Sequence, residues 1–307
     1  MSACRRALAW MLLALASCTD KPDGVPDLGA PPLLDLGPDL AGDPLIAARP
    51  YELRVPPGHD ASKPAPLVIL LHGYGLTGAE QERRFALSKA AADRGMLYAI
   101  PDGTRDESSL RFWNATDGCC NLNGAAVDDV AYLRALVRDV RGRYGVDPRR
   151  VFLIGHSNGG FMAYRMACDA ADLIAGVVSL AGATWTDEAR CQPSAAVAVL
   201  QVHGDQDAII RYGGGRFAAS LEPYPGARDT VAQWARKDRC SGALASAGSP
   251  LELDGDVAGA ETRPERYGGC PDAPVELWTM QGSGHFPELP PLWAERTLDF
   301  LLANPKR

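Results

Sequence analysis

The stretch that decides the fold is Val151-Phe-Leu-Ile-Gly-His-Ser-Asn-Gly-Gly-Phe-Met-Ala-Tyr-Arg-Met-Ala167. Its first four residues, Val151 to Ile154, are all apolar, which is typical of a short strand buried on both faces. Gly155-His-Ser-Asn-Gly159 then fits the pattern G-x-S-x-G, and the residues after it are those of a buried helix. A strand, a tight turn and a helix in this order favour a nucleophilic serine in the turn.

The turn itself restricts the residues that can form it. Ser157 is expected to adopt a strained backbone conformation that points its hydroxyl outward at the end of the strand. Side chains at the flanking positions would collide, which explains the glycines at 155 and 159. The free N–H groups at the start of the next helix would favour a negatively charged oxygen there. We therefore predict Ser157 as a nucleophile, and a Gly-rich turn with a structural serine is the alternative.

Length and charge narrow the class of protein. The chain has 307 residues, which suits one large domain with appendages. It carries 31 Lys and Arg residues against 38 Asp and Glu residues, a formal net charge of −7. No basic run extends beyond short arginine pairs, so neither nucleic acid nor an anionic membrane surface is expected as a partner.

The N-terminus resembles a targeting sequence. Residues 1–6 are basic, residues 7–16 are apolar, and Leu15-Ala-Ser-Cys18 follows. The apolar run is too short to span a bilayer, so residues 1–17 are predicted to be a signal peptide. The closing tetrad resembles a bacterial lipobox, which implies a lipid on Cys18 and anchoring to the outer membrane or cell surface. An ordinary signal peptide with a chance cysteine is the alternative.

A linker is predicted for residues 18–48. After Cys18 this segment alternates Asp, Pro, Gly and Leu without a helical or strand period. It cannot bury enough apolar surface to offset its ordering entropy, so we expect a disordered, acidic tether. The globular domain is then expected over residues 49–307.

Strands and helices alternate along the predicted domain. Tyr51–Val55 alternates like an exposed antiparallel strand. Buried strands are predicted at Leu67–Leu71, Met96–Ile100, Leu173–Leu180, Val197–Val202 and Val275–Met280. Helices are predicted at Glu80–Asp93, Val127–Tyr144, Arg228–Lys237 and Pro291–Leu302. Residues 240–272 are irregular, with one strand or hairpin. This order favours an α/β fold with a mostly parallel, doubly wound sheet and helices on both faces.

A serine nucleophile needs a histidine base and an acid that orients the histidine. His285 is the predicted base because it lies in a Gly-rich turn directly after the final strand, although a loop histidine that meets water is the alternative. The remaining four histidines have other predicted places. His59 lies in a loop before the core, His72 lies in the turn after the first long strand, His156 lies in the turn of Ser157, and His203 belongs to the turn that carries the acid. The acid is expected after the preceding strand, in His203-Gly-Asp-Gln-Asp207.

Two carboxylates compete for the role of the acid. Asp207 is favoured because the later position reaches further over the edge of the sheet, whereas Asp205 would cap the turn. A cation site between the two aspartates is a third interpretation, but no other ligand cluster supports a metal. The backbone N–H groups of Tyr74 and Asn158 are predicted to bind the oxyanion.

Eight cysteines indicate an oxidising compartment. Cys4 would leave with the signal peptide and Cys18 would carry lipid. Spacing suggests the pairs Cys168–Cys191 and Cys240–Cys270, which leaves Cys119 and Cys120 to bond with each other or separately with other partners. The pattern does not fit a zinc site.

Aromatic residues on the predicted loops could contact a substrate. They are Trp113, Trp185 and Tyr212. Such side chains could form aromatic walls for a phenolic or polyester substrate, and packing inside the domain is the alternative.

Taken together, the motifs resemble the α/β-hydrolase esterases of the LpqC-like group, which contains extracellular polyhydroxybutyrate depolymerases and feruloyl or acetylxylan esterases. The matching pieces are Leu71–Gly75, Trp113–Ala115 with Cys119-Cys120, Val127–Val130, Val146–Val151, Gly155–Gly160, His203–Asp207 and Gly282–His285. The resemblance covers most of residues 50–303 and implies the α/β-hydrolase fold with Ser157, Asp207 and His285 as a triad. Members often carry Thr before a Trp-Pro pair where this chain has Phe286, which leaves the substrate preference open.

The expected protein is a secreted, lipid-anchored serine esterase that works through an acyl-enzyme without a cofactor or metal. Its expected partner is an ester substrate, either a polyhydroxyalkanoate polyester or a feruloyl or acetyl ester of a plant polysaccharide. The alternatives are a serine peptidase with the same triad and a non-catalytic, surface-anchored binding module.

Overall fold

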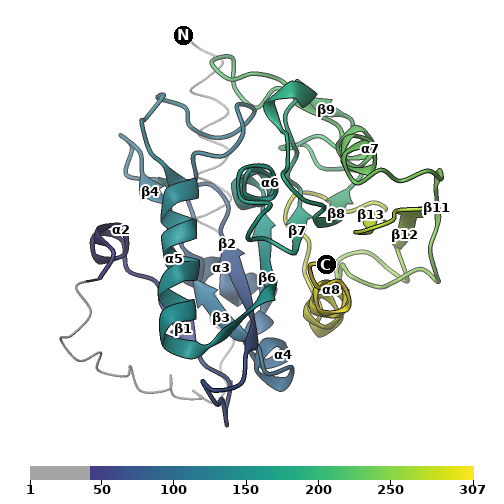
Figure 1. Cartoon of the computed structure of the whole chain (residues 1–307). Coiled ribbons are helices and arrows are strands. Elements are labelled where there is room, and N and C mark those ends of the chain that lie inside the picture. Colours follow the sequence, from purple (N-terminus) through teal and green to yellow (C-terminus); the bar gives the residue numbers. More distant parts are fainter. Residues whose placement is uncertain (1–41) are drawn as a thin grey trace, which may run out of the picture. The chain divides into compact units, whose positions relative to one another are not determined.

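The computed structural model describes residues 42–307 (Figure 1). The predicted signal peptide, Cys18 and the predicted linker up to residue 41 lie outside the described residues. Within residues 42–307, no helix combines the length and apolarity needed to cross a membrane.

A nine-stranded sheet forms the centre of the domain, in the order β1-β3-β2-β6-β7-β8-β13-β12-β11. The six strands from β3 to β13 pair in parallel, while β1 at one edge and β12 and β11 at the other are antiparallel. The strands are β1 Glu52–Arg54, β2 Ala65–Leu71, β3 Leu97–Ile100, β6 Val146–His156, β7 Gly176–Leu180, β8 Ala198–Gly204, β11 Leu244–Ser246, β12 Thr262–Tyr267 and β13 Val275–Met280. Two short pairs lie outside this sheet, β4 Thr104–Arg105 with β5 Arg111–Phe112 and β9 Gly214–Gly215 with β10 Tyr224–Pro225.

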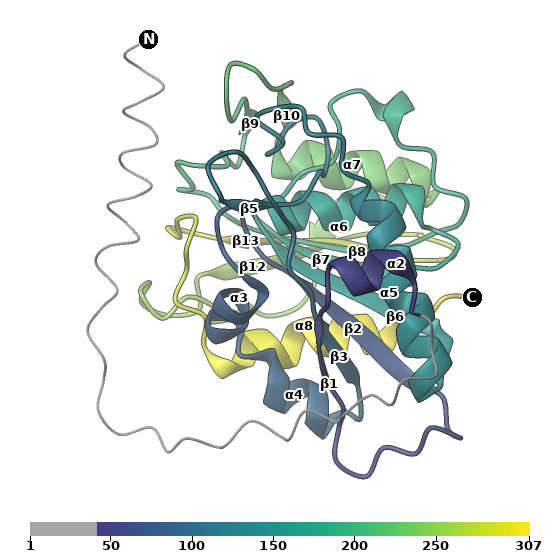
Figure 2. The same cartoon turned by 90° about the vertical axis from the view of Figure 1, so that its left-hand side faces the viewer.

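Helices cover both faces of the sheet (Figure 2). They are α2 Pro44–Ala48, α3 Gly78–Phe85, α4 Leu87–Asp93, α5 Asp129–Tyr144, α6 Asn158–Asp169, α7 Ala227–Lys237 and α8 Pro291–Ala303. Side chains of α5, α6 and α7 pack into one apolar core, and those of α3, α4 and α8 pack into a second core on the opposite face. The predicted fold class is therefore confirmed.

The central strands contribute to both cores at once. In β2, Leu67, Ile69 and Leu71 point into one core, whereas Val68 and Leu70 point into the other. Successive side chains of a strand face opposite sides, so a strand covered on both sides must be apolar at every position. This explains why the buried strands show continuous apolar runs in the sequence.

The helix predicted at Glu80–Asp93 is two helices in the structure. Ala86 adopts a left-handed conformation with φ 50° between α3 and α4. The buried carboxylate of Glu82 accepts the N–H groups of Leu87 (3.2 Å) and Ser88 (3.0 Å). It thereby satisfies donors that the first turn of α4 leaves free, and a break in the helix becomes tolerable.

The folded domain begins earlier than the sequence indicated. Asp43 caps the short helix α2 and pairs with Arg138 on α5 at 2.9 Å. Arg49 then reaches the fully buried carboxylate of Asp129 at 2.7 Å, and its guanidinium lies 3.5 Å from the ring centre of Tyr132. Residues 43–48, predicted as part of the linker, therefore pack on α5 as part of the domain.

Replacing Arg49 by Met is expected to lower the free energy of unfolding by about 3 kcal/mol, because the buried carboxylate of Asp129 would lose its charged partner. Urea unfolding at pH 7 measures the change. Arg141→Met, at an exposed position on the same helix as Asp129, is the control and should stay within about 0.5 kcal/mol of wild type. Equal losses in the two variants would contradict the role of the pair.

A second buried carboxylate has almost no partners. Asp238 ends α7, and only one of its oxygens is used, by the Val197 N–H at 3.4 Å. The other oxygen has no hydrogen-bond partner within residues 42–307. Burial, with a smaller contribution from the charge of Asp272, raises the pKa of Asp238 to about 7. The folded protein therefore keeps a proton that the unfolded chain releases near pH 4.

Stability should fall as the pH rises from about 4 to about 7, because the unfolded state binds fewer protons across that window. Asp238→Asn removes this dependence. As the pH rises through this window, wild type loses stability and the variant does not. The difference in unfolding free energy, variant minus wild type, should therefore increase by at most about 1.4 kcal/mol per pH unit. Urea unfolding at several pH values checks this, and parallel curves for the two proteins would contradict it.

Candidate active site

Ser157 lies in the strained turn that the sequence predicted. It connects β6 to α6 with φ 53° and ψ −120°, and its N–H donates to the carbonyl of Leu180 at 2.8 Å. A β-carbon added at Gly155 would collide with the backbone of Gly159, and one added at Gly159 would collide with the carbonyl of Leu71. The turn can therefore approach its neighbours only because these positions are glycine.

His285 and Asp207 meet directly. Nδ1 of His285 lies 2.6 Å from Oδ2 of Asp207, and both side chains are buried. The other carboxylate oxygen of Asp207 accepts the N–H groups of Ile209 (2.8 Å) and Ile210 (2.9 Å). The carboxylate thus cannot rotate freely, and it holds the imidazole so that Nε2 stays available.

Asp207 remains ionised. Burial alone would raise its pKa, but hydrogen bonds from His203 and His285 outweigh burial and hold the pKa well below its usual range. His203 lies beside the same carboxylate, with Nε2 3.4 Å from Oδ2 of Asp207 and 2.7 Å from the carbonyl of Ile210. The sequence reading treated His203 only as part of the turn, so its contact with the acid is an additional finding.

Asp205 does not touch the histidine base but supports its loop. Its Oδ1 accepts the N–H of Gly282 at 2.8 Å, and the neighbouring Gln206 N–H donates to the carbonyl of Ser283 at 3.0 Å. The two aspartates of the motif therefore have different positions, one at the imidazole and one at the loop that carries it.

His156 fastens the same loop from the other side. Its Nε2 donates to the carbonyl of His285 at 2.9 Å, and the two rings lie 4.8 Å apart. Burial, followed by the charge that His285 would carry, lowers the pKa of His156 to about 3. His156 is thus neutral and buried, and it ties the loop of His285 to the turn that carries Ser157. G-x-S-x-G alone gives no signal of this contact.

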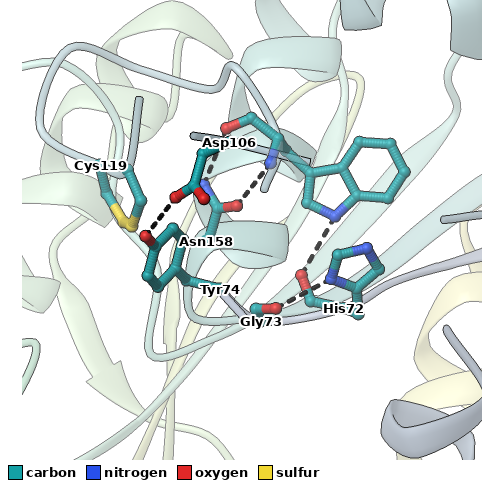
Figure 3. The surroundings of a disulfide bond; sticks show 8 residues. His72, Gly73, Tyr74, Asp106, Cys119 and Asn158 are labelled. Carbon is teal, nitrogen blue, oxygen red and sulfur yellow. Dashed lines mark hydrogen bonds between the residues drawn. A yellow bond between two sulfur atoms is a disulfide. The ribbon is translucent and has the colours of Figure 1, made fainter. Parts of the chain in front are cut away.

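The turn after β2 lies close to the turn Gly155–Gly159 that carries Ser157, which we call the elbow (Figure 3). The Asn158 carboxamide pairs with both backbone groups of Trp113, accepting its N–H at 2.7 Å and donating to its carbonyl at 3.0 Å. The indole of Trp113 in turn donates to the carbonyl of His72 at 3.1 Å. Trp113 therefore bridges the start of α6 and the turn that contains Tyr74.

Two backbone donors remain available at this place. Asn158 is the first residue of α6, so its N–H has no intrahelical acceptor. In residues 42–307, no backbone acceptor is found for the N–H of Tyr74. The ring of Tyr74 is held by a hydrogen bond from its hydroxyl to Asp106 at 2.5 Å. Asn158 directly follows Ser157, and Tyr74 follows Gly73, where an added β-carbon would lie 3.6 Å from Cβ of Ser157.

Burial of His72 also keeps this turn neutral. Its Nε2 accepts the N–H of Gly103 at 2.8 Å, and its Nδ1 lies 2.8 Å from the carbonyl of Gly73. Burial lowers the pKa of His72 to about 4, so the imidazole is uncharged at neutral pH. His72 thus shapes the turn, and the structure agrees with its exclusion as the base.

The aromatic residues predicted to contact a substrate are mostly packed inside the domain. Trp113 is fully buried, and its position in a loop was misleading because its indole and backbone fill the bridge described above. Trp185 is 7% exposed. Tyr212 is half-buried, bonded through its hydroxyl to Thr279 at 2.7 Å and packed against the ring of His203. The prediction of an aromatic wall is therefore wrong for Trp113 and has little support for the other two.

The six cysteines within the described residues form three disulfides. Cys168 pairs with Cys191, Cys240 with Cys270, and Cys119 with its neighbour Cys120. Tyr74, Asp106 and Asn158 belong to the surroundings of the adjacent pair (Figure 3).

Comparison with known proteins finds esterases among the relatives of this chain. The pattern of the Phospholipase/Carboxylesterase family matches residues 125–222, a range that contains Ser157 and Asp207 but not His285. NocK of Nocardia uniformis, which is named as an esterase, is 35% identical over 167 residues, covering 54% of this chain and 47% of NocK. Feruloyl esterase B of Piromyces equi is 27% identical over 241 residues, covering 76% of this chain and 42% of that protein. The chain thus spans less than half the length of these two relatives.

Solved structures show the same architecture. The acetyl xylan esterase from Aspergillus awamori superimposes with a TM-score of 0.56 and 15% identity, over 82% of this chain and 93% of that one. A thermostable esterase gives a TM-score of 0.56 at 14% identity, over 84% of this chain and 60% of that one. At such identities the likeness concerns the fold, and the chain has the α/β-hydrolase fold.

Gly159→Ala should abolish folding of the elbow, because the added methyl group would overlap the carbonyl of Leu71. We expect loss of soluble protein or a cooperative thermal transition at much lower temperature. Gly142→Ala is the matched control, since nothing lies within 4 Å of a β-carbon there. In the last turn of α5 this change should raise stability by at most about 0.5–1 kcal/mol. Similar thermal transitions in the two variants would refute the steric argument.

Proposed function

We propose that this protein is a serine esterase that hydrolyses carboxylic esters through an acyl-enzyme. The observation that carries the proposal is the strained Ser157 one residue after His156, whose ring lies 4.8 Å from the ring of His285 in the buried His285–Asp207 pair, in a fold shared with solved esterases. A strained, positive-φ serine at the carboxyl end of a parallel strand is costly and is typical of a nucleophile.

Acylation would begin with attack of Ser157 Oγ on the ester carbonyl carbon while Nε2 of His285 takes the hydroxyl proton. The ionised Asp207 stabilises the imidazolium that forms. The N–H groups of Tyr74 and Asn158 would bind the negative carbonyl oxygen. The bond from the carbonyl carbon to the alcohol oxygen then breaks, and Nε2 returns the proton to the leaving alcohol.

Deacylation repeats these steps with water. A water molecule gives a proton to Nε2 of His285 while its oxygen attacks the acyl carbon. Ser157 Oγ then leaves and recovers the proton. The sum consumes one water and releases one acid and one alcohol, so the reaction balances with no further reactant.

The substrate class is proposed from the relatives and from the sequence. Feruloyl esterase B is named for feruloyl esters and the acetyl xylan esterase for acetyl xylan, which makes feruloyl and acetyl esters the first candidates. A polyhydroxyalkanoate polyester is the second candidate, on the motifs shared with depolymerases. The resemblance of Leu15-Ala-Ser-Cys18 to a lipobox supports secretion and attachment to the cell surface.

Ser157→Ala is expected to lower ester hydrolysis by at least about a thousandfold, because the nucleophile is removed while the oxyanion donors remain. Released acid from methyl ferulate, acetylated xylan and amorphous polyhydroxybutyrate would be measured by chromatography. Ser249→Ala, an exposed serine between β11 and β12, is the control and should match wild type.

Labelling by a fluorophosphonate distinguishes the remaining alternatives. An esterase is labelled at Ser157 and releases acid from at least one ester. Labelling with cleavage of a peptide library but of no ester would replace the proposal by a peptidase. An unlabelled, folded wild type would favour a non-catalytic binding module.

A further inference from the structure

An exposed aromatic ring lies directly beside the proposed base. Phe286 follows His285 and is 42% exposed, and it is one of two large apolar side chains exposed within residues 42–307. Its ring packs edge-on against His285, with centroids 4.8 Å apart, and lies 5.3 Å from the ring of His156. The rest of the ring offers an apolar surface at the edge of the site.

The chemistry of the proposed reaction determines which part of a substrate meets this ring. The leaving alcohol must receive its proton from Nε2 of His285, so the alcohol portion lies on the histidine side of the ester. The carbonyl oxygen lies on the other side, at Tyr74 and Asn158. Because Phe286 packs on the imidazole, it belongs to the alcohol side.

A cation accompanies the ring. The guanidinium of Arg84, an exposed residue in the last turn of α3, lies 5.1 Å from the ring centre of Phe286. Its positive charge also contributes to lowering the pKa of the buried His156, after burial and His285. An arginine stacked on an aromatic ring still presents N–H groups at its edges, where a carboxylate can bind in a bidentate manner.

The carboxylates of the same helix are bound to other partners. Glu80, one turn earlier, is held by the backbone and hydroxyl of Thr77 at 2.7 Å. Glu82 is buried and binds the hydroxyl of Tyr98 at 2.5 Å. No carboxylate within residues 42–307 lies within salt-bridge distance of Arg84. The positive charge beside the base is therefore available to a ligand.

We propose that Phe286 and Arg84 form a subsite for an alcohol portion that carries a carboxylate, with its apolar part on Phe286 and its charge on Arg84. This inference rests on the proposed esterase function and specifies its substrate class. Two sources share this chemistry, namely the free carboxyl end of a hydroxyalkanoate oligoester and a uronate unit of an acidic polysaccharide.

A matched pair of substrates tests the proposal. The first is the linear dimer of 3-hydroxybutyrate with its free carboxylate, and the second is the same dimer with a primary amide in place of the carboxylate. Acetylated xylo-oligosaccharides with and without a glucuronate branch form the second pair. The purified wild-type chain should show a higher kcat/KM for the anionic member of at least one pair, and that pair identifies the source.

Arg84→Gln should lower kcat/KM for the preferred anionic substrate about tenfold, mainly through KM, and leave its neutral partner within about twofold. Arg83→Gln is the matched control, since it removes the same charge from the adjacent exposed position on α3. It should leave the preference within about twofold of wild type.

Three outcomes would overturn the inference. Equal rates on both members of each pair in wild type would remove the subsite while the esterase proposal stands. An equal loss of preference in the Arg84 and Arg83 variants would assign the effect to the general field of α3. Hydrolysis of no ester above the level of Ser157→Ala would refute both the subsite and the proposed function.

Discussion

The site depends on a close approach of backbones that only glycine permits. Around the elbow, β-carbons at Gly155, Gly159 and Gly182 would collide with neighbouring main chain, and one at Gly160 would collide with the hydroxyl of Ser179. Their absence lets α6 approach β2 and β7 closely enough to hold Ser157 at φ 53°. Strain of this kind persists only where the surrounding structure fixes it. The buried apolar strands on either side hold the turn in place. The packing of the two cores therefore fixes the strained conformation of Ser157.

The acid and the base are held by redundancy in their hydrogen bonds. Asp207 accepts two backbone N–H groups in addition to its contact with the imidazole. The loop of His285 is bound by Asp205 through the N–H of Gly282 and by His156 through the carbonyl of His285. His156 packs against this loop, and burial keeps this histidine neutral. A charged imidazolium can therefore form at His285 without a positive charge on the ring of His156. The proposed chemistry needs this separation of protonation states.

Sequence reasoning located the elements that depend on local pattern, because strand periodicity and the glycine spacing around Ser157 are written in consecutive residues. His285 and Asp207 could be chosen by chain order along the sheet. Contacts between distant segments could not be foreseen. Glu82 caps a helix beyond its own, and Trp113 fills a bridge between two turns although it lies in a loop. Arg49 joins the domain through its ion pair with Asp129, which lies eighty residues further along the chain. Each of these depends on tertiary contacts with no period in the sequence.

The disulfide between Cys168 and Cys191 has a topological consequence. It joins the end of α6, the helix that begins beside Ser157, to the segment before β8, the strand that leads to Asp207. A single proteolytic nick between these two cysteines would separate the peptide of the nucleophile from the peptide of the acid and base. While the bridge is oxidised, the two fragments remain one covalent molecule, so the exposed connection around Glu188 can be cut without dissociation of the two halves.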